Sequence, residues 1–177
     1  MEVLQGRPTD ETGRLEKEIA VYDLLDKLDI PFRRVDHVHA DTMEMCQEID
    51  QALGQDICKN LFLSNRQKTK FYLLLMPGDK PFKTKDLSAQ IGSSRLSFGG
   101  AEDMERLLNL TPGSVTVLGL MYDPDCQVTL LIDQDLYQQS AFGCHPCINT
   151  STVQFSTADF REKLLPALGH PVTLVQL

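Results

Sequence analysis

The sequence predicts a single α/β (α+β) domain with one mixed, mainly antiparallel sheet covered by helices. Apolar residues at helical spacing are intermixed with short apolar runs typical of strands, and polar turns join several of these runs as hairpins. The strict strand–helix alternation of a doubly wound sheet is absent. A chain of 177 residues buries a core without metals or disulfides as staples, so we expect one domain over residues 1–177, flexible only over residues 1–12.

The first part of the chain predicts a helix, a strand and a second helix. Apolar residues recur every three or four positions over Thr12–Leu28, and Pro31 marks the break after this helix. The segment Phe32–Val38 follows the break and is expected as a strand. Residues Met43–Leu53 predict the next helix, which Gly54 closes.

The middle of the chain predicts a hairpin followed by two short helices. Asn60–Leu63 and Phe71–Met76 are apolar runs on either side of a polar stretch, the pattern of two buried antiparallel strands joined by an exposed turn. A helix over Thr84–Ile91 follows the next turn. A short strand over Leu96–Phe98 and a helix over Ala101–Leu108 come after it.

The last third predicts a second hairpin, a strand, a long helix and a final strand. Val115–Tyr122 and Val128–Ile132 flank an Asp-Pro-Asp turn, which indicates the hairpin. A strand rich in Thr and Val is expected over Ile148–Phe155. A Ser and an Asp at capping-box spacing then predict a helix over Thr157–Leu168, and Val172–Val175 is expected as the last strand.

The formal net charge of -8 argues against a protein that coats nucleic acid, because non-specific affinity for phosphates grows with the number of Lys and Arg contacts. Lys and Arg gather between Lys59 and Arg106, which fits either a solvated face or a local phosphate contact. Neither an apolar run of ~20 residues nor a signal peptide is evident, so a cytoplasmic location without membrane contact is expected. The five cysteines are then expected as free thiols.

Two cysteines stand close together in Cys144-His145-Pro146-Cys147, a spacing that fits a redox dithiol, half a zinc site or a loop whose histidine alone matters. A redox dithiol opens a helix, whose dipole lowers the thiol pKa, but this motif contains Pro146 and precedes a predicted strand. Zinc needs four ligands, or three and a water, and no second Cys or His pair has matching spacing. We therefore expect neither a metal nor a cofactor.

Polar residues introduce three of the expected strands: Lys59-Asn60, Gly113-Ser114, and His145 with Asn149 and Thr150. Hydrolase nucleophile motifs and Gly-rich phosphate loops are absent. From the residues alone, a surface lysine and a structural histidine are at least as good an interpretation as a shared site.

Four motifs occur in order along the chain. They are Lys59-Asn60-Leu61-Phe62-Leu63, Arg95-Leu96-Ser97-Phe98-Gly99, Leu110-Thr111-Pro112-Gly113-Ser114-Val115-Thr116 and His145-Pro146-x-x-Asn149-Thr150. Together they resemble the YbaK/prolyl-tRNA-synthetase-associated domain family, and within it the free-standing ProXp-ala (PrdX-type) branch, from about Glu16 to the C-terminal helix. The resemblance implies a compact α/β fold with a curved mixed sheet, a site without metal, and trans-editing by hydrolysis of mischarged alanyl-tRNA(Pro).

The resemblance also implies roles for individual residues. Lys59 and Asn60 would hold the ester of the aminoacyl-tRNA, and His145 would position its terminal adenosine. Gly113 would begin a loop whose backbone N–H groups bind the substrate carbonyl. Further substrate contacts are expected at Ser114, Val115, Thr116, Asn149, Thr150, Thr42 and Phe32. The pocket that selects the amino acid is expected near Ile30, Phe32, His39, Thr42 and Met45.

One position departs from the family pattern. The Gly-x-x-x-Pro loop of the family ends here in Val117, and without the fixed φ angle of proline the loop is expected to be less rigid. Cys144 and Cys147 are not family signatures, so exchanging both for serine is expected to leave deacylation intact.

Two alternatives stay open. In the first, the enzyme hydrolyses another small aminoacyl-tRNA, such as cysteinyl-tRNA(Pro). In the second, the chain binds aminoacyl-tRNA without hydrolysing it. The implied partner is the acceptor end of tRNA(Pro), with transient contact to prolyl-tRNA synthetase or an elongation factor.

Overall fold

The strands form two sheets in the structure, a computed structural model that describes residues 1–177. The four-stranded sheet is antiparallel throughout, in the order β1 (Leu4–Gln5), β2 (Arg33–Asp36), β8 (Ser151–Ser156) and β7 (Ala141–Cys144). The five-stranded sheet is mixed, in the order β5 (Ser97–Phe98), β3 (Lys59–Ser64), β4 (Phe71–Met76), β6 (Val128–Asp133) and β9 (Val172–Val175). The predicted fold class is confirmed, but its strands divide between two sheets instead of sharing one.

All five predicted helices are present. They are α1 (Glu16–Lys27), α2 (Met43–Leu53), α3 (Thr84–Ile91), α4 (Ala101–Leu108) and a C-terminal helix made of α5 (Thr157–Asp159), a π-helical turn (Phe160–Leu164) and α6 (Leu165–Leu168). Ser156 caps this last helix by accepting a hydrogen bond from the backbone N–H of Asp159 at 3.1 Å, as the capping-box spacing predicts.

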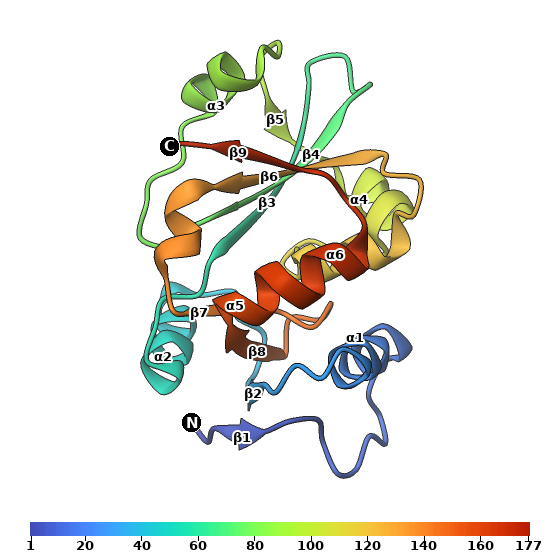
Figure 1. The fold of residues 1–177 in the computed structure, drawn as a ribbon, viewed down its shortest axis with the longest axis vertical. Coiled ribbons are helices and arrows are strands. Elements are labelled where there is room, and N and C mark those ends of the chain that lie inside the picture. The colour runs from blue at the N-terminus through green and yellow to red at the C-terminus, as the bar shows by residue number, and fades with distance from the viewer.

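The C-terminal helix lies between the two sheets and joins their cores (Figure 1). Phe160 stacks on Phe142 of β7 with ring centroids 4.1 Å apart, and Phe155 of β8 approaches the same ring. The same core continues into the five-stranded sheet through Leu73 and Leu130. Both sheets are therefore fixed relative to one another by one buried apolar surface, which is the driving force for the fold.

The predicted hairpin over Val115–Tyr122 and Val128–Ile132 is wrong. Thr116 begins a 3-10 helix over Val117–Tyr122, and β6 pairs in parallel with both β4 and β9. The apolar run is buried, and the periodicity of a short apolar run does not separate a strand from a helical turn.

The Asp-Pro-Asp turn leads into β6 through a buried carboxylate. Asp123 accepts hydrogen bonds from the backbone N–H groups of Gln127 and Val128 at 3.0 and 2.8 Å, and its other contact is His170 Nε2 at 2.9 Å. These bonds connect the start of β6 to the segment before β9. The turn therefore prepares a parallel pairing with a distant strand instead of a hairpin.

Two further strands differ from expectation. β1 pairs Leu4 with Arg34 within the segment expected to be flexible, and β7 over Ala141–Cys144 had no strand assigned to it. Strand β8 begins at Ser151, so His145 to Thr150 form a loop between β7 and β8. None of the helices has both the length and the apolar character that a membrane crossing demands.

Candidate active site

The four residues with predicted catalytic roles meet at two adjoining cavities. Lys59 and His145 line a cavity of about 360 Å³, and Asn60, Gly113 and His145 line a second of about 240 Å³. Ile57, Cys58 and His145 line both cavities, so the two adjoin. Strand β3, the loop after α4 and the β7–β8 loop supply these residues from distant parts of the sequence.

His145 is held in one tautomer by the backbone. Its Nδ1–H donates to the carbonyl of Ser151 at 2.9 Å, and no hydrogen bond of the chain involves Nε2. Burial lowers the pKa of His145 below its usual value of 6.5, and His37, whose ring centroid lies 6.0 Å away, acts in the same direction. At neutral pH the ring is uncharged, and Nε2 presents a lone pair that accepts a hydrogen bond.

Lys59 carries a positive charge without an acidic partner. Its Nζ donates to the backbone carbonyl of Lys80, and no carboxylate of the chain forms an ion pair with it. The side chain is half-buried at the start of β3. A cation in this position is available for a phosphate, a carboxylate or a developing oxyanion of a ligand.

Asn60 uses both ends of its amide within the protein. Its Nδ2 donates to the carbonyl of Cys58 at 3.3 Å, and its Oδ1 accepts the backbone N–H of Val117 at 3.0 Å. The second bond connects β3 to the end of the Gly113–Val117 loop. The valine that departs from the family pattern therefore supplies an N–H group that proline lacks.

Gly113 adopts a conformation that other residues rarely take. Its φ is +92°, and a Cβ built on it would lie 3.0 Å from Asn149 Nδ2. Asn149 is itself held, because Nδ2 donates to Asp41 at 3.0 Å and Oδ1 accepts the N–H of Ala40 at 3.0 Å. Glycine is required here both for the positive φ and for the close approach.

The loop presents backbone donors to the smaller cavity. The N–H groups of Gly113 and Val115 donate to no backbone carbonyl of the chain, and both residues line the cavity. Two unpaired N–H groups on one concave surface are suited to bind a carbonyl oxygen or an oxyanion.

Several predicted substrate contacts lie elsewhere. Ser114 Oγ donates to the carbonyl of Thr111 at 2.8 Å and Thr116 Oγ1 accepts the N–H of Leu118 at 3.3 Å, so both hydroxyls serve the loop itself. Thr42 caps α2 by accepting the N–H of Met45, and it does not line the cavities. Phe32 belongs to the core, where it is 5% exposed and stacks on Tyr22.

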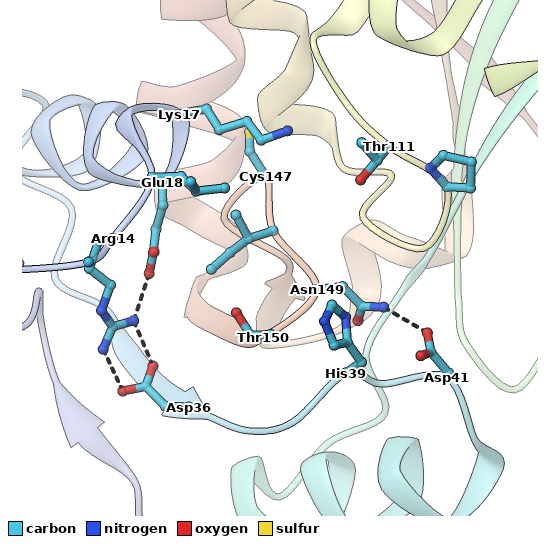
Figure 2. Close-up of a pocket in the computed structure, with 14 residues that line it drawn as sticks. Arg14, Lys17, Glu18, Asp36, His39, Asp41, Thr111, Cys147, Asn149 and Thr150 are labelled. Carbon is cyan, nitrogen blue, oxygen red and sulfur yellow. Dashed lines mark hydrogen bonds and ion pairs between the residues drawn. The ribbon is translucent and has the colours of Figure 1, made fainter. Parts of the chain in front are cut away.

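Asn149 and Thr150 line a different, polar cavity of about 750 Å³ beside α1 (Figure 2). Arg14 there pairs with Glu18 at 2.7 Å and with Asp36 at 3.0 Å, so its charge is balanced within the protein. Asn149 reaches the Lys59 site only through its contact with Gly113. The smaller cavities, which bring together the four residues with predicted catalytic roles and free backbone donors, are the better candidate for chemistry.

Residues that no motif indicated complete the site. Ile57, Cys58 and Asp50 line the cavity of about 360 Å³ beside Lys59, and Asp50 also accepts the N–H of Ile57 at 2.9 Å. The only sequence signal for the first two was their position directly before Lys59. The residues expected near the amino acid pocket line neither of the two smaller cavities; among them, Ile30 lies in the core and His39 lines the polar cavity.

The paired cysteines are buried thiols. Burial raises the pKa of Cys144 and of Cys147 to about 12, so neither is a thiolate at neutral pH. Cys144 lines the smaller cavity, whereas Cys147 lies against the polar cavity. Neither sulfur is activated as a nucleophile.

Comparisons with known proteins identify the family of the chain. The model of the aminoacyl-tRNA editing domain matches residues 37–163. The "prolyl-tRNA editing protein ProX" of Acetoanaerobium sticklandii is 31% identical over 92% of this chain and 99% of its own length. The "prolyl-tRNA synthetase associated domain-containing protein 1" of Danio rerio is 28% identical over 90% of this chain and 86% of its own.

Among solved structures, a candidate trans-editing enzyme for prolyl-tRNA synthetase superposes with a TM-score of 0.66 over 92% of this chain and 98% of its own, at 16% identity. This likeness establishes the fold. With the family match and the relative in A. sticklandii, it leads to one assignment: the chain belongs to the aminoacyl-tRNA editing domain family.

Proposed function

We propose that this chain is a trans-editing deacylase that hydrolyses the ester of mischarged alanyl-tRNA(Pro), with Lys59, Gly113 and His145 at the reacting ester. One observation carries the proposal. An unpaired lysine and a neutral histidine line one cavity, and free backbone N–H groups line the cavity that adjoins it. Family membership and the name of the A. sticklandii relative support the same reaction.

Hydrolysis here needs positioning and charge stabilisation. Water attacks the ester carbonyl carbon, the bond to the ribose oxygen breaks, and alanine and tRNA leave. The N–H groups of Gly113 and Val115 stabilise the oxyanion that forms in between, an effect of about 3 kcal/mol per donor in other enzymes. No covalent enzyme intermediate is involved, because the cysteines near the site are protonated.

His145 and Lys59 hold the 3′ end of the tRNA. The free Nε2 of His145 accepts a ribose hydroxyl of the terminal adenosine, whose position then fixes the ester over the loop. Lys59 places its cation beside the negative charge of the nucleotide. A ribose hydroxyl of the substrate assists the attacking water, because the terminal adenosine already engages the free Nε2 of His145.

The cavity of about 360 Å³ beside Lys59 suits a small amino acid. Ala40, Ile49 and Ile57 give it an apolar surface, and Asp50 and Asp56 supply negative charge for the α-ammonium group. A synthetase pocket built for proline rejects the smaller alanine only weakly, because lost apolar contact is worth about 1–3 kcal/mol. A separate hydrolytic site corrects the error.

The direct test is deacylation of alanyl-tRNA(Pro) by the protein and by Lys59→Ala. The wild type is expected to release alanine well above the uncatalysed rate, and Lys59→Ala to slow release by at least tenfold because the 3′ nucleotide that positions the ester loses its cationic contact. Lys68→Ala, which removes an exposed lysine far from the cavities along β3, serves as the matched control and keeps full activity. Undiminished release by Lys59→Ala would contradict the assigned role.

A panel of mischarged tRNAs separates the alternatives. Faster release from cysteinyl-tRNA(Pro) than from alanyl-tRNA(Pro) would change the substrate, and tight binding without release from any member would make the chain a binding module. The proposal expects the highest rate on alanyl-tRNA(Pro). It includes a cytoplasmic location and transient contact with prolyl-tRNA synthetase or an elongation factor.

A further inference from the structure

The hydrogen bond between Val117 and Asn60 joins residues 57 positions apart in the sequence. Val117 is fully buried at the first position of the 3-10 helix, where a backbone N–H has no partner within the helix. Asn60 Oδ1 accepts this N–H at 3.0 Å. The N–H end of this bond is buried, and a buried donor is costly to leave without a partner.

This bond exists only because residue 117 is not proline. Thr116 before it is extended, with φ -155° and ψ 150°, and the first position of a helix accepts proline readily. The backbone is therefore suited to the Gly-x-x-x-Pro pattern of the family, yet proline would remove the N–H that Asn60 accepts. Valine keeps the same backbone path and adds a connection to β3.

A side-chain amide lies at each end of the loop from Gly113 to Val117. Asn149 packs against Gly113, and Asn60 binds Val117. Gly113 and Val115, which line the cavity and whose N–H groups donate to no backbone carbonyl, lie within this segment. Their aim at the substrate carbonyl thus depends on where β3 places the amide of Asn60.

We propose that Asn60 is a positioning residue, which acts through the N–H of Val117 to set the Gly113–Val117 loop, and not a residue that contacts the ester. The inference rests on the proposed deacylase function and revises the catalytic role that the family resemblance implies for Asn60. Its Nδ2 bond to the carbonyl of Cys58 points to the same conclusion, because the amide is already engaged within the protein at both ends.

A double-mutant cycle on single-turnover deacylation of alanyl-tRNA(Pro) tests this role. Asn60→Ala and Val117→Pro are each expected to slow the chemical step about tenfold, while the tRNA Kd stays within about twofold. The double variant is expected to be as slow as either single variant, because both changes remove the same bond. Losses that multiply to about a hundredfold, or a Val117→Pro variant as fast as wild type, would overturn the proposal.

Two controls keep the test independent of folding and of the reaction. Val117→Ala keeps the N–H, shortens the side chain and is expected to be faster than Val117→Pro in the chemical step; thermal melting checks that each variant folds. Amide exchange reports the bond without any substrate: the N–H of Val117 is expected to exchange slowly in the wild type and faster in Asn60→Ala. Unchanged exchange would refute the bond, whereas absent turnover by the wild type would refute only the deacylase function.

Discussion

His145 shows how a backbone carbonyl sets the chemistry of a side chain. The bond from Nδ1–H to Ser151 leaves Nε2 as the only free nitrogen, and burial keeps the ring neutral. The ring therefore serves as a hydrogen-bond acceptor for a ribose hydroxyl, which an imidazolium ion is unable to do. Ser151 at the start of β8 and His145 therefore act together at the site.

The pH dependence of deacylation follows from the lowered pKa of His145. A lowered pKa means that the neutral ring persists to lower pH, so the activity is present above the usual pKa of 6.5 and is lost only as the pH falls below it. Single-turnover rates between pH 5 and 8, corrected for uncatalysed hydrolysis, measure this fall. A His145→Gln variant is expected to be slower and to lack the acid limb; an acid limb centred above 6.5 would contradict the assignment.

Cys144 and Cys147 are expected to be dispensable for catalysis. Both thiols are protonated at neutral pH because burial raises their pKa to about 12. Exchanging both for serine should leave the rate of alanine release within about threefold of wild type, although buried hydroxyls cost stability of about 1–3 kcal/mol. The double Cys→Ala variant separates these effects, and a collapse of activity in a variant that melts normally would make a thiol part of the mechanism.

The residues of the candidate site that belong to sequence motifs were predictable, whereas the residues that line its pocket were not. Lys59, Gly113 and His145 are recognisable from the motifs around them, and the structure brings them together. Phe32 and Thr42 line neither of the two smaller cavities, because Phe32 packs in the core and Thr42 caps α2, and no local pattern says which residues meet a pocket formed by distant loops.

At the scale of the element, local signals were sufficient for helices. Caps and spacing lie within a few residues of one another, and α2 with its Gly54 cap matches its predicted bounds. The strand over Val128–Ile132 was predicted and is present as β6, but its parallel pairing was not predictable in the same way, because pairing with β4 and β9 joins segments far apart in the sequence. For the same reason, no local sequence signal predicts the division of the strands into two sheets.

The cap of the C-terminal helix gives a stability prediction. Ser156→Ala removes the acceptor for the N–H of Asp159 and is expected to lower the free energy of unfolding by about 1 kcal/mol. Urea denaturation measures it, with Ser156→Asp as the variant that keeps a capping oxygen. Alanine release at 25 °C is expected to be unchanged, since Ser156 lines neither of the two smaller cavities.

At the scale of the whole molecule, a net charge of -8 limits the number of tRNA phosphates that the protein contacts. Binding through one or two phosphates near Lys59 predicts a Kd that rises about three- to tenfold between 50 and 200 mM salt, because each contact releases close to one counterion. Lys59→Ala is expected to lower the slope of log Kd against log salt by about one. Fluorescence anisotropy of labelled tRNA(Pro) measures the slope, and an affinity independent of salt would count against a phosphate contact.

The position of β9 at the end of the chain has a consequence for folding during synthesis. β6 lies between β4 and β9, and β9 follows every other strand in the sequence. While the chain emerges from the ribosome, one edge of β6 stays unpaired until residues up to Val175 are free. The nascent chain therefore carries an open, apolar sheet edge late in synthesis, which is the state most exposed to aggregation and to capture by chaperones.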